Sequence, residues 1–312
     1  MSEQAENWER QTLEKVALAA VTEQRRARKW SIFFKLAGLL YLFLVLFLAM
    51  GFMDRSELPA SKDHTAMVSL EGVIAPGSQA SAERMIEGLQ TAFKAKHAKG
   101  IILRINSPGG SPVQAGQIND EIKRLKAKNP KMPLYVVIDD ICASGGYYVA
   151  VAADKIYVDK ASLVGSIGVL MDGFGFTGSM EKLGVERRLL TAGENKGFLD
   201  PFSPVDPAQK AHVQAMLGEI HQQFIDTVKT GRGARLKETE GMFSGLIWTG
   251  ARSVELGLAD AYGSIETVAR DVIKAEDIVD YTPRQSFADR FAKRLGAASA
   301  EALISSMGAK LQ

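Results

Sequence analysis

The sequence contains little cysteine and little net charge, and each shortage excludes a class of protein. Cys142 is the one cysteine in 312 residues, so the chain can form no internal disulfide and no cysteine-based zinc finger or ribbon. The 38 Lys and Arg residues against 36 Asp and Glu leave a net charge of +2, which gives no indication of nucleic-acid binding. With 46% hydrophobic and 24% charged residues, the composition is that of a globular protein.

One segment departs from this average, because residues 36–53 carry no charge. A helix of that length measures about 27 Å, close to the thickness of the apolar core of a bilayer. Five basic residues and no acidic residue lie just before it: Arg25, Arg26, Arg28, Lys29 and Lys35. Basic residues that flank a membrane span stay in the cytoplasm, so the segment is predicted to be a single-pass signal anchor. The N-terminus would then be cytoplasmic, and the chain after the anchor would lie on the other side of the membrane. A cleaved signal peptide, with a small-x-small triplet at Ala49–Gly51, is the alternative and exports the same part.

Composition shifts divide the chain into five predicted parts. A basic segment (1–35) precedes the anchor (36–53), and a polar linker (54–65) follows it. Residues 66–272 are predicted to form one folded domain, since no internal repeat is found. Residues 273–312 are predicted to be a helical tail, in which Phe287, Phe291 and Leu295 recur at four-residue spacing.

Short aliphatic or β-branched runs alternate with helical patterns in the folded domain. Strands are predicted at 67–74, 100–105, 134–138, 155–158, 163–170 and 185–190, and helices at 81–96, 112–128, 145–153, 177–183, 207–230 and 251–257. This alternation predicts an α/β fold with a largely parallel sheet. Ligands bind at the carboxyl ends of strands in such sheets, so the turns there are the candidates for a site.

Two of these turns contain paired glycines. Gly109 and Gly110 follow the strand at 100–105, and Ser144 stands before Gly145 and Gly146 after the strand at 134–138. Glycine allows backbone amides to approach a substrate carbonyl, and small neighbours leave a serine accessible as a nucleophile. Either turn alone is weak evidence, because a Gly-Gly pair usually serves a tight turn and a serine at a helix start is usually an N-cap.

A nucleophilic serine needs a base, and histidine is poorly placed for that role. No histidine lies between residues 97 and 212, where the strand ends cluster, and a surface position is predicted for all four: His64, His97, His212 and His221. Lysine can serve instead when burial lowers its pKa, because the neutral amine is then present. Lys196, in a turn between Gly193 and Gly197, is the candidate, with a solvated surface lysine as the alternative.

Five motifs in order along residues 66–272 resemble the signal peptide peptidase A, or protease IV, family. They are Arg104–Gly110, Ala143–Tyr148, Val164–Val169, Thr191–Lys196 and the pair Trp248–Gly250 with Glu255–Asp260. The resemblance implies the Clp protease/crotonase-like fold, with repeated ββα units, preceded by the transmembrane helix. It also implies a serine endopeptidase with a Ser-Lys dyad, which needs no metal or other cofactor.

The resemblance implies roles for particular residues. Ser144 matches the family nucleophile, Lys196 the general base, and Ser166 the serine that orients the lysine amine. The amides of Gly110 and Gly145 are the candidates for the oxyanion hole, with Gly109 and the amide of Ser144 as the respective alternatives. Gly197 departs from the acidic residue that often follows the lysine, which puts a local contact in doubt and not the dyad.

The resemblance also implies partners and a location. Short members form rings in which serine comes from one protomer and lysine from the next, so a homo-oligomer, an octamer, is expected. The peptidase domain is expected on the periplasmic side of the bacterial inner membrane, in contact with lipid through the anchor. Hydrophobic peptides such as remnant signal peptides are the expected substrates, and nucleic acid is not. A crotonase-type acyl-CoA enzyme and a catalytically silent membrane scaffold remain as alternatives.

Overall fold

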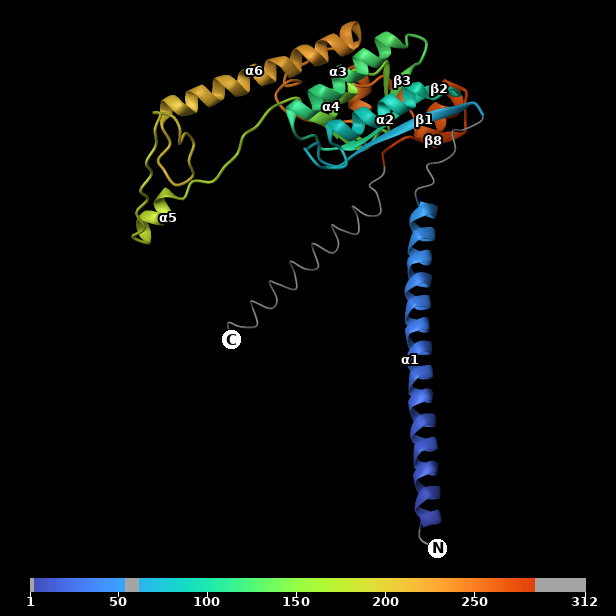
Figure 1. Cartoon of the computed structure of the whole chain (residues 1–312). Coiled ribbons are helices and arrows are strands. Elements are labelled where there is room, and N and C mark those ends of the chain that lie inside the picture. The colour runs from blue at the N-terminus through green and yellow to red at the C-terminus, as the bar shows by residue number, and fades with distance from the viewer. Residues whose placement is uncertain (1–2, 54–61, 284–312) are drawn as a thin grey trace. The chain divides into compact units, whose positions relative to one another are not determined.

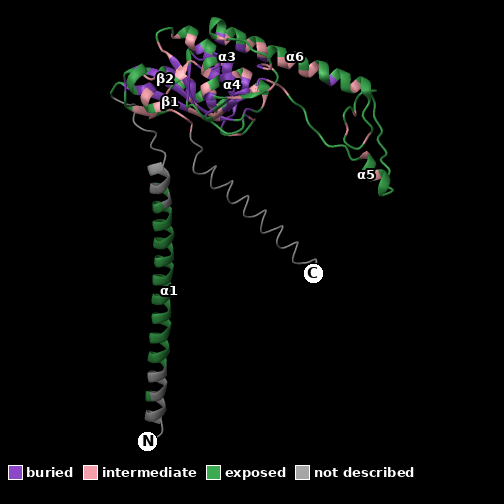
Figure 2. Ribbon diagram, turned by 180° about the vertical axis from the view of Figure 1, so that it is seen from behind, coloured by how far each residue is buried: buried purple, intermediate pink, exposed green. Residues whose placement is uncertain are grey.

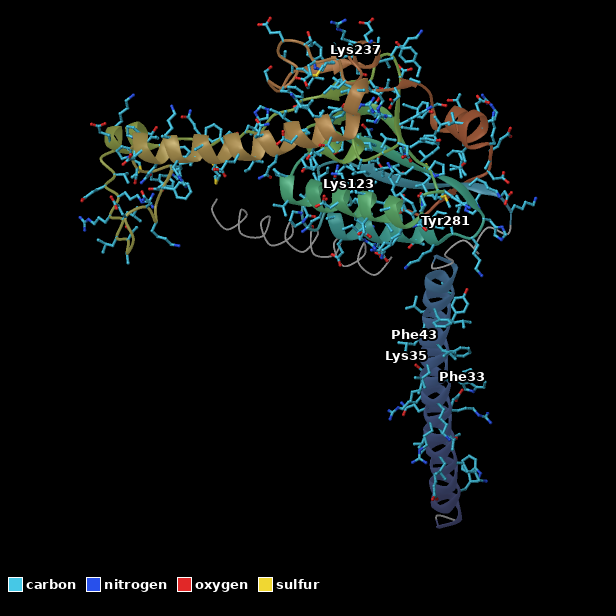
Figure 3. The ribbon with its side chains drawn as sticks, turned by 90° about the horizontal axis from the view of Figure 1, so that it is seen from above. Phe33, Lys35, Phe43, Lys123, Lys237 and Tyr281 are labelled. Atoms are coloured by element: carbon cyan, nitrogen blue, oxygen red, sulfur yellow. The ribbon has the colours of Figure 1, made fainter. Side chains whose placement is uncertain are left out.

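The computed structural model of the chain describes residues 3–53 and 62–283, and the chain divides into two compact units. One unit comprises Met1–Leu58 with Arg284–Gln312, and its described part is the long helix α1 (Glu3–Met53). Phe33, Lys35 and Phe43 project outward from α1 (Figure 3). In the described part of the chain, no helix has both the length and the apolarity to cross a membrane. The predicted anchor lies within α1, and the predicted helix from Phe287 onward lies outside the described residues.

The second unit, Pro59–Pro283, contains one sheet of eight strands (Figure 1). Its main path runs in the order β6 (Ile247–Thr249), β5 (Leu163–Gly165), β3 (Leu134–Ala143), β2 (Ala98–Ser107), β1 (His64–Glu71) and β8 (Ile278–Asp280). Off this path, β4 (Lys155–Val158) pairs with β3 and with β7 (Ala261–Tyr262). Every pair is parallel except β5 with β6, so the predicted α/β fold with a largely parallel sheet is confirmed.

Helices pack against the sheet, except α5, which lies in an extended segment away from it (Figure 1). They are α2 (Ala82–Lys94), α3 (Pro112–Lys128), α4 (Gly145–Ala150), α5 (Thr177–Lys182), α6 (Pro207–Arg232), α7 (Gly250–Glu255) and α8 (Ile265–Thr267), with the 3₁₀ turn η1 (Gly233–Arg235) and the π-helical turn η2 (Val268–Ile273). Side chains of successive strand residues point to opposite faces. Accordingly Leu103 belongs to the main core with α2, α3 and α4, whereas Ile102 packs with η2 on the other face.

Four predictions about local structure were wrong. The helical tail predicted at 273–312 does not begin at residue 273, because Ile278–Asp280 forms β8 and pairs with β1 in the sheet. The strand predicted at 163–170 ends at Gly165, because Ser166 has a φ of 51° and turns the chain out of the sheet. The strand predicted at 185–190 is not a strand, because that segment is exposed and has no neighbouring strand to bond with. His64 is not at the surface: it is the first residue of β1 and 2% exposed, and its Nε2 lies 2.9 Å from the hydroxyl of Tyr281.

Between β5 and α6 the chain forms an arm, residues 170–206, which extends from the sheet together with the N-terminal half of α6 (Figure 1). The arm has local order: the rings of Phe176 and Phe202 stack with centroids 5.4 Å apart, and Arg187 forms an ion pair with Asp200. Most of the arm is exposed (Figure 2), including many apolar side chains. At least half exposed are Leu170, Met171, Phe174, Leu183, Val185, Leu190 and Val205. Monomeric proteins rarely expose so much contiguous apolar surface, so the arm is a candidate interface.

Candidate functional site

The two glycine-containing turns meet at the carboxyl ends of β2 and β3. These strands are neighbours, with Ser107 paired to Cys142, so the turns that follow them lie side by side. Gly109 is so close to the second turn that a Cβ placed on it would lie 2.7 Å from the Cβ of Ser144 and 2.7 Å from the amide nitrogen of Gly145. Its φ of 102° also favours glycine. The close approach therefore explains why glycine occupies this position.

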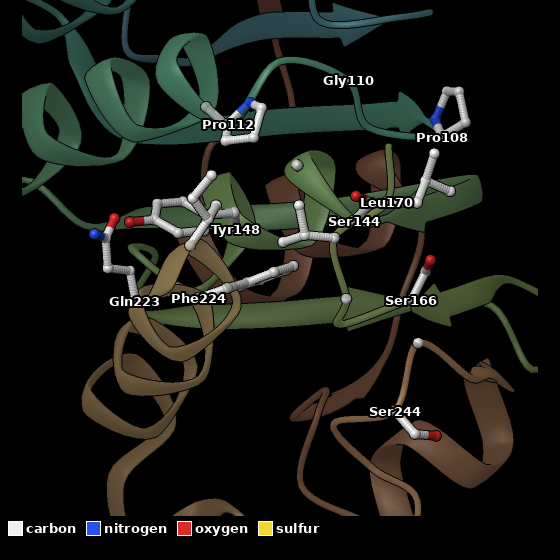
Figure 4. A pocket seen from close by; sticks show the side chains of 16 residues that line it. Pro108, Gly110, Pro112, Ser144, Tyr148, Ser166, Leu170, Gln223, Phe224 and Ser244 are labelled. Atoms are coloured by element: carbon white, nitrogen blue, oxygen red, sulfur yellow. The ribbon is translucent and has the colours of Figure 1, made fainter. Parts of the chain in front are cut away.

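A cavity of about 560 Å³ opens beside these turns (Figure 4). Ser144 and Ser166 both line it, on residues that follow β3 and β5. Its other lining residues are mainly apolar, and Figure 4 shows Tyr148 and Phe224 side by side at one end. They include Pro108, Pro112, Ala115, Val169, Leu170 and Ile220. An apolar cavity with few polar groups is typical of a ligand site.

Ser144 is partly buried at the cavity, and its geometry is that of an accessible nucleophile more than that of a helix cap. It occupies the N-cap position of α4 but makes no side-chain capping bond, and its Oγ has no hydrogen bond with any residue that the structure describes. Its φ of 50° and ψ of −123° are unfavourable for a residue other than glycine, at a cost of about 1–3 kcal/mol. Such strain is commonly found at functional sites.

The four amides considered for an oxyanion hole differ in their hydrogen bonds. The amide of Gly109 donates to Ser107 Oγ at 3.1 Å, and the amide of Ser144 donates to the carbonyl of Gly165 at 2.8 Å. The amides of Gly110 and Gly145 have no acceptor among the described residues. They are near each other, since a Cβ on Gly145 would lie 3.3 Å from the nitrogen of Gly110. The geometry therefore favours Gly110 and Gly145 over the two alternatives.

Ser166 is partly buried and its backbone is held at the cavity wall. Its amide donates to the carbonyl of Leu246 at 2.8 Å, and its φ of 51° turns the following residues along the cavity. Within the described ranges its Oγ has no hydrogen-bond partner, so the hydroxyl is available to another group. The structure thus brings together four of the five predicted site residues: Ser144, Ser166, Gly110 and Gly145.

Lys196 is the fifth predicted site residue, and one chain does not bring it to the cavity. It lies in the exposed arm, where its amide donates to the carbonyl of Gly193 at 3.1 Å. Its ammonium group makes no ion pair or hydrogen bond with the residues that the structure describes, and it does not line the cavity with Ser144. A single chain therefore presents the serine, the two amides and the cavity, and none of the described residues that line this cavity is a lysine or a histidine.

Cys142 is close to Ser144 in sequence but is not a competing nucleophile. It is fully buried in the main core, and this burial raises the pKa of its thiol. The thiolate is the nucleophilic form, so a raised pKa makes the residue inert at neutral pH.

Helix α6 contributes residues to the cavity that the sequence did not indicate. Ile220, Gln223 and Phe224 line it, and Thr227 donates a hydrogen bond of 3.1 Å to the hydroxyl of Tyr148. The four-residue spacing of Ile220 and Phe224 on a mostly polar helix was the available signal.

Comparison with known proteins identifies the family. The profile of peptidase family S49 matches residues 126–278. A putative protease of Methanocaldococcus jannaschii is 31% identical over 213 residues, which are 67% of this chain and 68% of that protein. The chain belongs to peptidase family S49. The resemblance stated from the motifs is thereby confirmed.

Other S49-like proteins differ in length. A putative signal peptide peptidase SppA of Enterococcus faecium is 28% identical over 231 residues, covering 72% of this chain and 67% of that protein. A Brucella melitensis protein named Na(+)/H(+) antiporter NhaA is 41% identical over 215 residues, or 69% of this chain. The matched part spans only 29% of the length of that relative.

Proposed function

We propose that the chain is a membrane-anchored serine endopeptidase that uses a Ser144–Lys196 dyad on hydrophobic peptides, including remnant signal peptides. The observation that carries the proposal is the strained Ser144, whose free hydroxyl faces an apolar cavity beside two unengaged amides. Membership in family S49 supports the same chemistry. The fold assignment to the Clp protease/crotonase type belongs to this proposal.

The mechanism follows from these groups. The neutral amine of Lys196 removes the proton from Ser144, and the alkoxide attacks the peptide carbonyl to form a tetrahedral intermediate. The amides of Gly110 and Gly145 donate to its oxyanion, an interaction worth about 3–4 kcal/mol per donor. As the intermediate collapses, Lys196 returns the proton to the leaving amine, and water then hydrolyses the acyl-enzyme by the same route. The hydroxyl oxygen of Ser166 accepts a hydrogen bond from the amine of Lys196 and thereby orients it.

We infer that each site combines Ser144 of one protomer with Lys196 of a neighbouring one. Two observations support this part of the proposal: Lys196 lies outside the cavity of its own chain, and the arm that carries it exposes a large apolar surface. Burial of that surface against a second copy would remove it from water and take Lys196 out of bulk solvent, which favours the neutral amine. A closed ring, an octamer by family resemblance, would bury every arm.

The anchor and the location are also proposals. The uncharged run at 36–53 and the basic residues before it support an N-terminus in the cytoplasm and a peptidase domain on the periplasmic side. Bilayer lipid would then contact the anchor, and the membrane would bring apolar peptide segments to the cavity. Cysteine labelling of residue 2 and residue 62 in intact cells tests the orientation, since only an outside residue reacts with an impermeant maleimide.

Mixing two inactive variants tests the dyad. Ser144→Ala and Lys196→Ala should each abolish cleavage of a hydrophobic fluorogenic peptide while leaving assembly intact. When the two variants are co-assembled in equal amounts, about a quarter of shared sites should combine an intact serine with an intact lysine. Recovery near that fraction supports shared sites. No recovery in a mixed assembly would point to a dyad within one chain, and full activity of Lys196→Ala would exclude the lysine as base.

A further inference from the structure

Helix α6 touches the cavity wall through a residue that does not itself line the cavity. The Nε2 atom of His221 lies 3.2 Å from the carbonyl oxygen of Ile167. A carbonyl oxygen can only accept, so Nε2 carries the hydrogen and donates it. Ile167 is fully buried and directly follows Ser166. His221 is thus one residue from the serine that is proposed to orient the lysine.

The segment after β5, residues 166–170, forms one wall of the cavity and has few bonds of its own. The amide of Ser166 donates to Leu246, and Gly168 packs so closely on Gly245 that a Cβ placed on it would lie 3.1 Å from the Cα of Gly245. The segment has no strand pairing in the described structure, although Gly168, Val169 and Leu170 all line the cavity. The His221 contact is therefore a sizeable part of what fixes this wall.

The part of α6 that carries His221 is packed firmly against the main core. Phe224 and Val228, on the following turns of α6, are 4% and 0% exposed and belong to the main core. Two hydrogen bonds then hold the backbone on either side of this dipeptide: the amide of Ser166 donates to the carbonyl of Leu246, and the carbonyl of Ile167 accepts from the side chain of His221. With both ends of this dipeptide held, the strained backbone at Ser166, which carries the hydroxyl, is restrained.

We propose that His221 is a positioning residue, which holds the wall segment 166–170 through the Ile167 carbonyl and so orients Ser166 for the lysine amine. This inference rests on the proposed function, because the role of Ser166 does. Small misplacements of a catalytic group are costly, so the predicted consequence is a loss in kcat more than in substrate binding.

Three variants of the full-length protein in detergent micelles test the role. His221→Leu removes the donor, His221→Gln keeps a side-chain N–H of similar reach, and His212→Leu is the matched control because His212 is exposed on the same helix. We expect His221→Leu to lower kcat by about tenfold with a smaller change in KM, because the reacting groups lose alignment. We expect His221→Gln to recover most of the rate and His212→Leu to match the parent.

Hydrogen exchange distinguishes positioning from general destabilisation. In His221→Leu, exchange should become faster at the amides of residues 167–170 and stay unchanged in β2, β3 and α3. An unchanged kcat, a His221→Gln variant as slow as His221→Leu, or faster exchange throughout the sheet would each overturn the inference. If the parent cleaves no peptide, the proposed function fails. In that case, faster exchange confined to residues 167–170 in His221→Leu still supports the contact between His221 and Ile167. If exchange there is not faster, the contact is overturned as well.

Discussion

The buried ion pair between Arg232 and Asp260 should make a large contribution to stability that depends on pH. Arg232, the last residue of α6, is 1% exposed, and its two terminal nitrogens each donate to a carboxylate oxygen of Asp260 at 2.9 Å. Its Nε donates to the carbonyl of Gly257 at 2.7 Å. Asp260 also accepts from the amide of Ile156 at 2.7 Å and contacts Arg235 at 3.2 Å. The pair thereby fixes the C-terminal end of α6 to the sheet.

Replacing Arg232 by methionine should be costly because it leaves a carboxylate in the interior without its main partner. Breaking a buried pair in this way costs about 3–5 kcal/mol. Arg235 still contacts Asp260 after the change, so we expect the lower end, about 3 kcal/mol. Arg235→Met is the matched control: this side chain is 39% exposed, and an exposed pair contributes about 1 kcal/mol or less.

The pH dependence has a definite sign. Burial raises the pKa of Asp260, but the hydrogen bonds and charge of Arg232 outweigh it and hold that pKa below its usual value. In the parent, the stabilisation is present above the unfolded pKa of about 3.9 and is lost as pH falls through the folded pKa. In Arg232→Met the main group that lowers this pKa is gone, while the raising effect of burial stays and is opposed only by the Ile156 amide and Arg235, so ionisation of Asp260 stabilises the fold less than in the parent. The deficit of the variant should therefore be largest at pH 7 and shrink below about pH 4.

Urea unfolding at two pH values measures this deficit. Of the three tryptophans, Trp248 packs against the main core, so a background with Trp8→Phe and Trp30→Phe leaves it as the fluorescent reporter. Free energies of unfolding are compared for parent, Arg232→Met and Arg235→Met at pH 7 and at pH 3, below the ordinary pKa of an aspartate. A deficit below about 1 kcal/mol at pH 7, or one that is equal at both pH values, would refute the reasoning.

Two further predictions concern the site and the arm. Gly110→Ala should lower kcat by about 100- to 1,000-fold, because the new Cβ would lie 2.1 Å from the carbonyl oxygen of Ile74 and displace a proposed oxyanion donor. The rate of peptide hydrolysis at saturating substrate measures this loss, and a decrease of less than threefold would contradict the prediction. Leu190→Asp, at an arm residue that is 95% exposed, should dissociate the assembly without changing the melting temperature. Sedimentation velocity measures the size of the assembly, and Lys123→Asp, on the exposed face of α3, is the control. An assembly of Leu190→Asp that stays intact would contradict the prediction.

The sequence predicted those parts of the fold whose signals are local. Helix α3 has the predicted bounds, 112–128, because Ser111 caps it through a bond from the amide of Gln114 and Pro112 occupies its first turn. The sheet was predicted because alternating strands and helices permit few arrangements. By contrast, residues 185–190 have the composition of a strand, yet whether a strand forms depends on a pairing partner, which no local pattern specifies.

The candidate site was predictable to a similar extent. The glycine turns and Ser144 converge because β2 and β3 are neighbours, which the order of the motifs along a parallel sheet already suggested. The contribution of α6 was not predictable, because Phe224 reaches the cavity, and His221 the carbonyl of Ile167, only through the packing of that helix on α4. His64 was misplaced for the same reason, since its burial depends on Tyr281, distant in sequence.

The structure divides the proposed chemistry between a rigid part and an exposed part of the same chain. The backbone strain at Ser144 and the two unengaged amides are already present in one chain. The free energy of folding therefore offsets their energetic cost, and assembly does not have to. Lys196 stands on the arm, where apolar side chains remain in water until a partner covers them. Under the proposed function, assembly then adds only the base to a site that is otherwise complete. An isolated chain would be inert, and proteolysis would begin only where subunits associate.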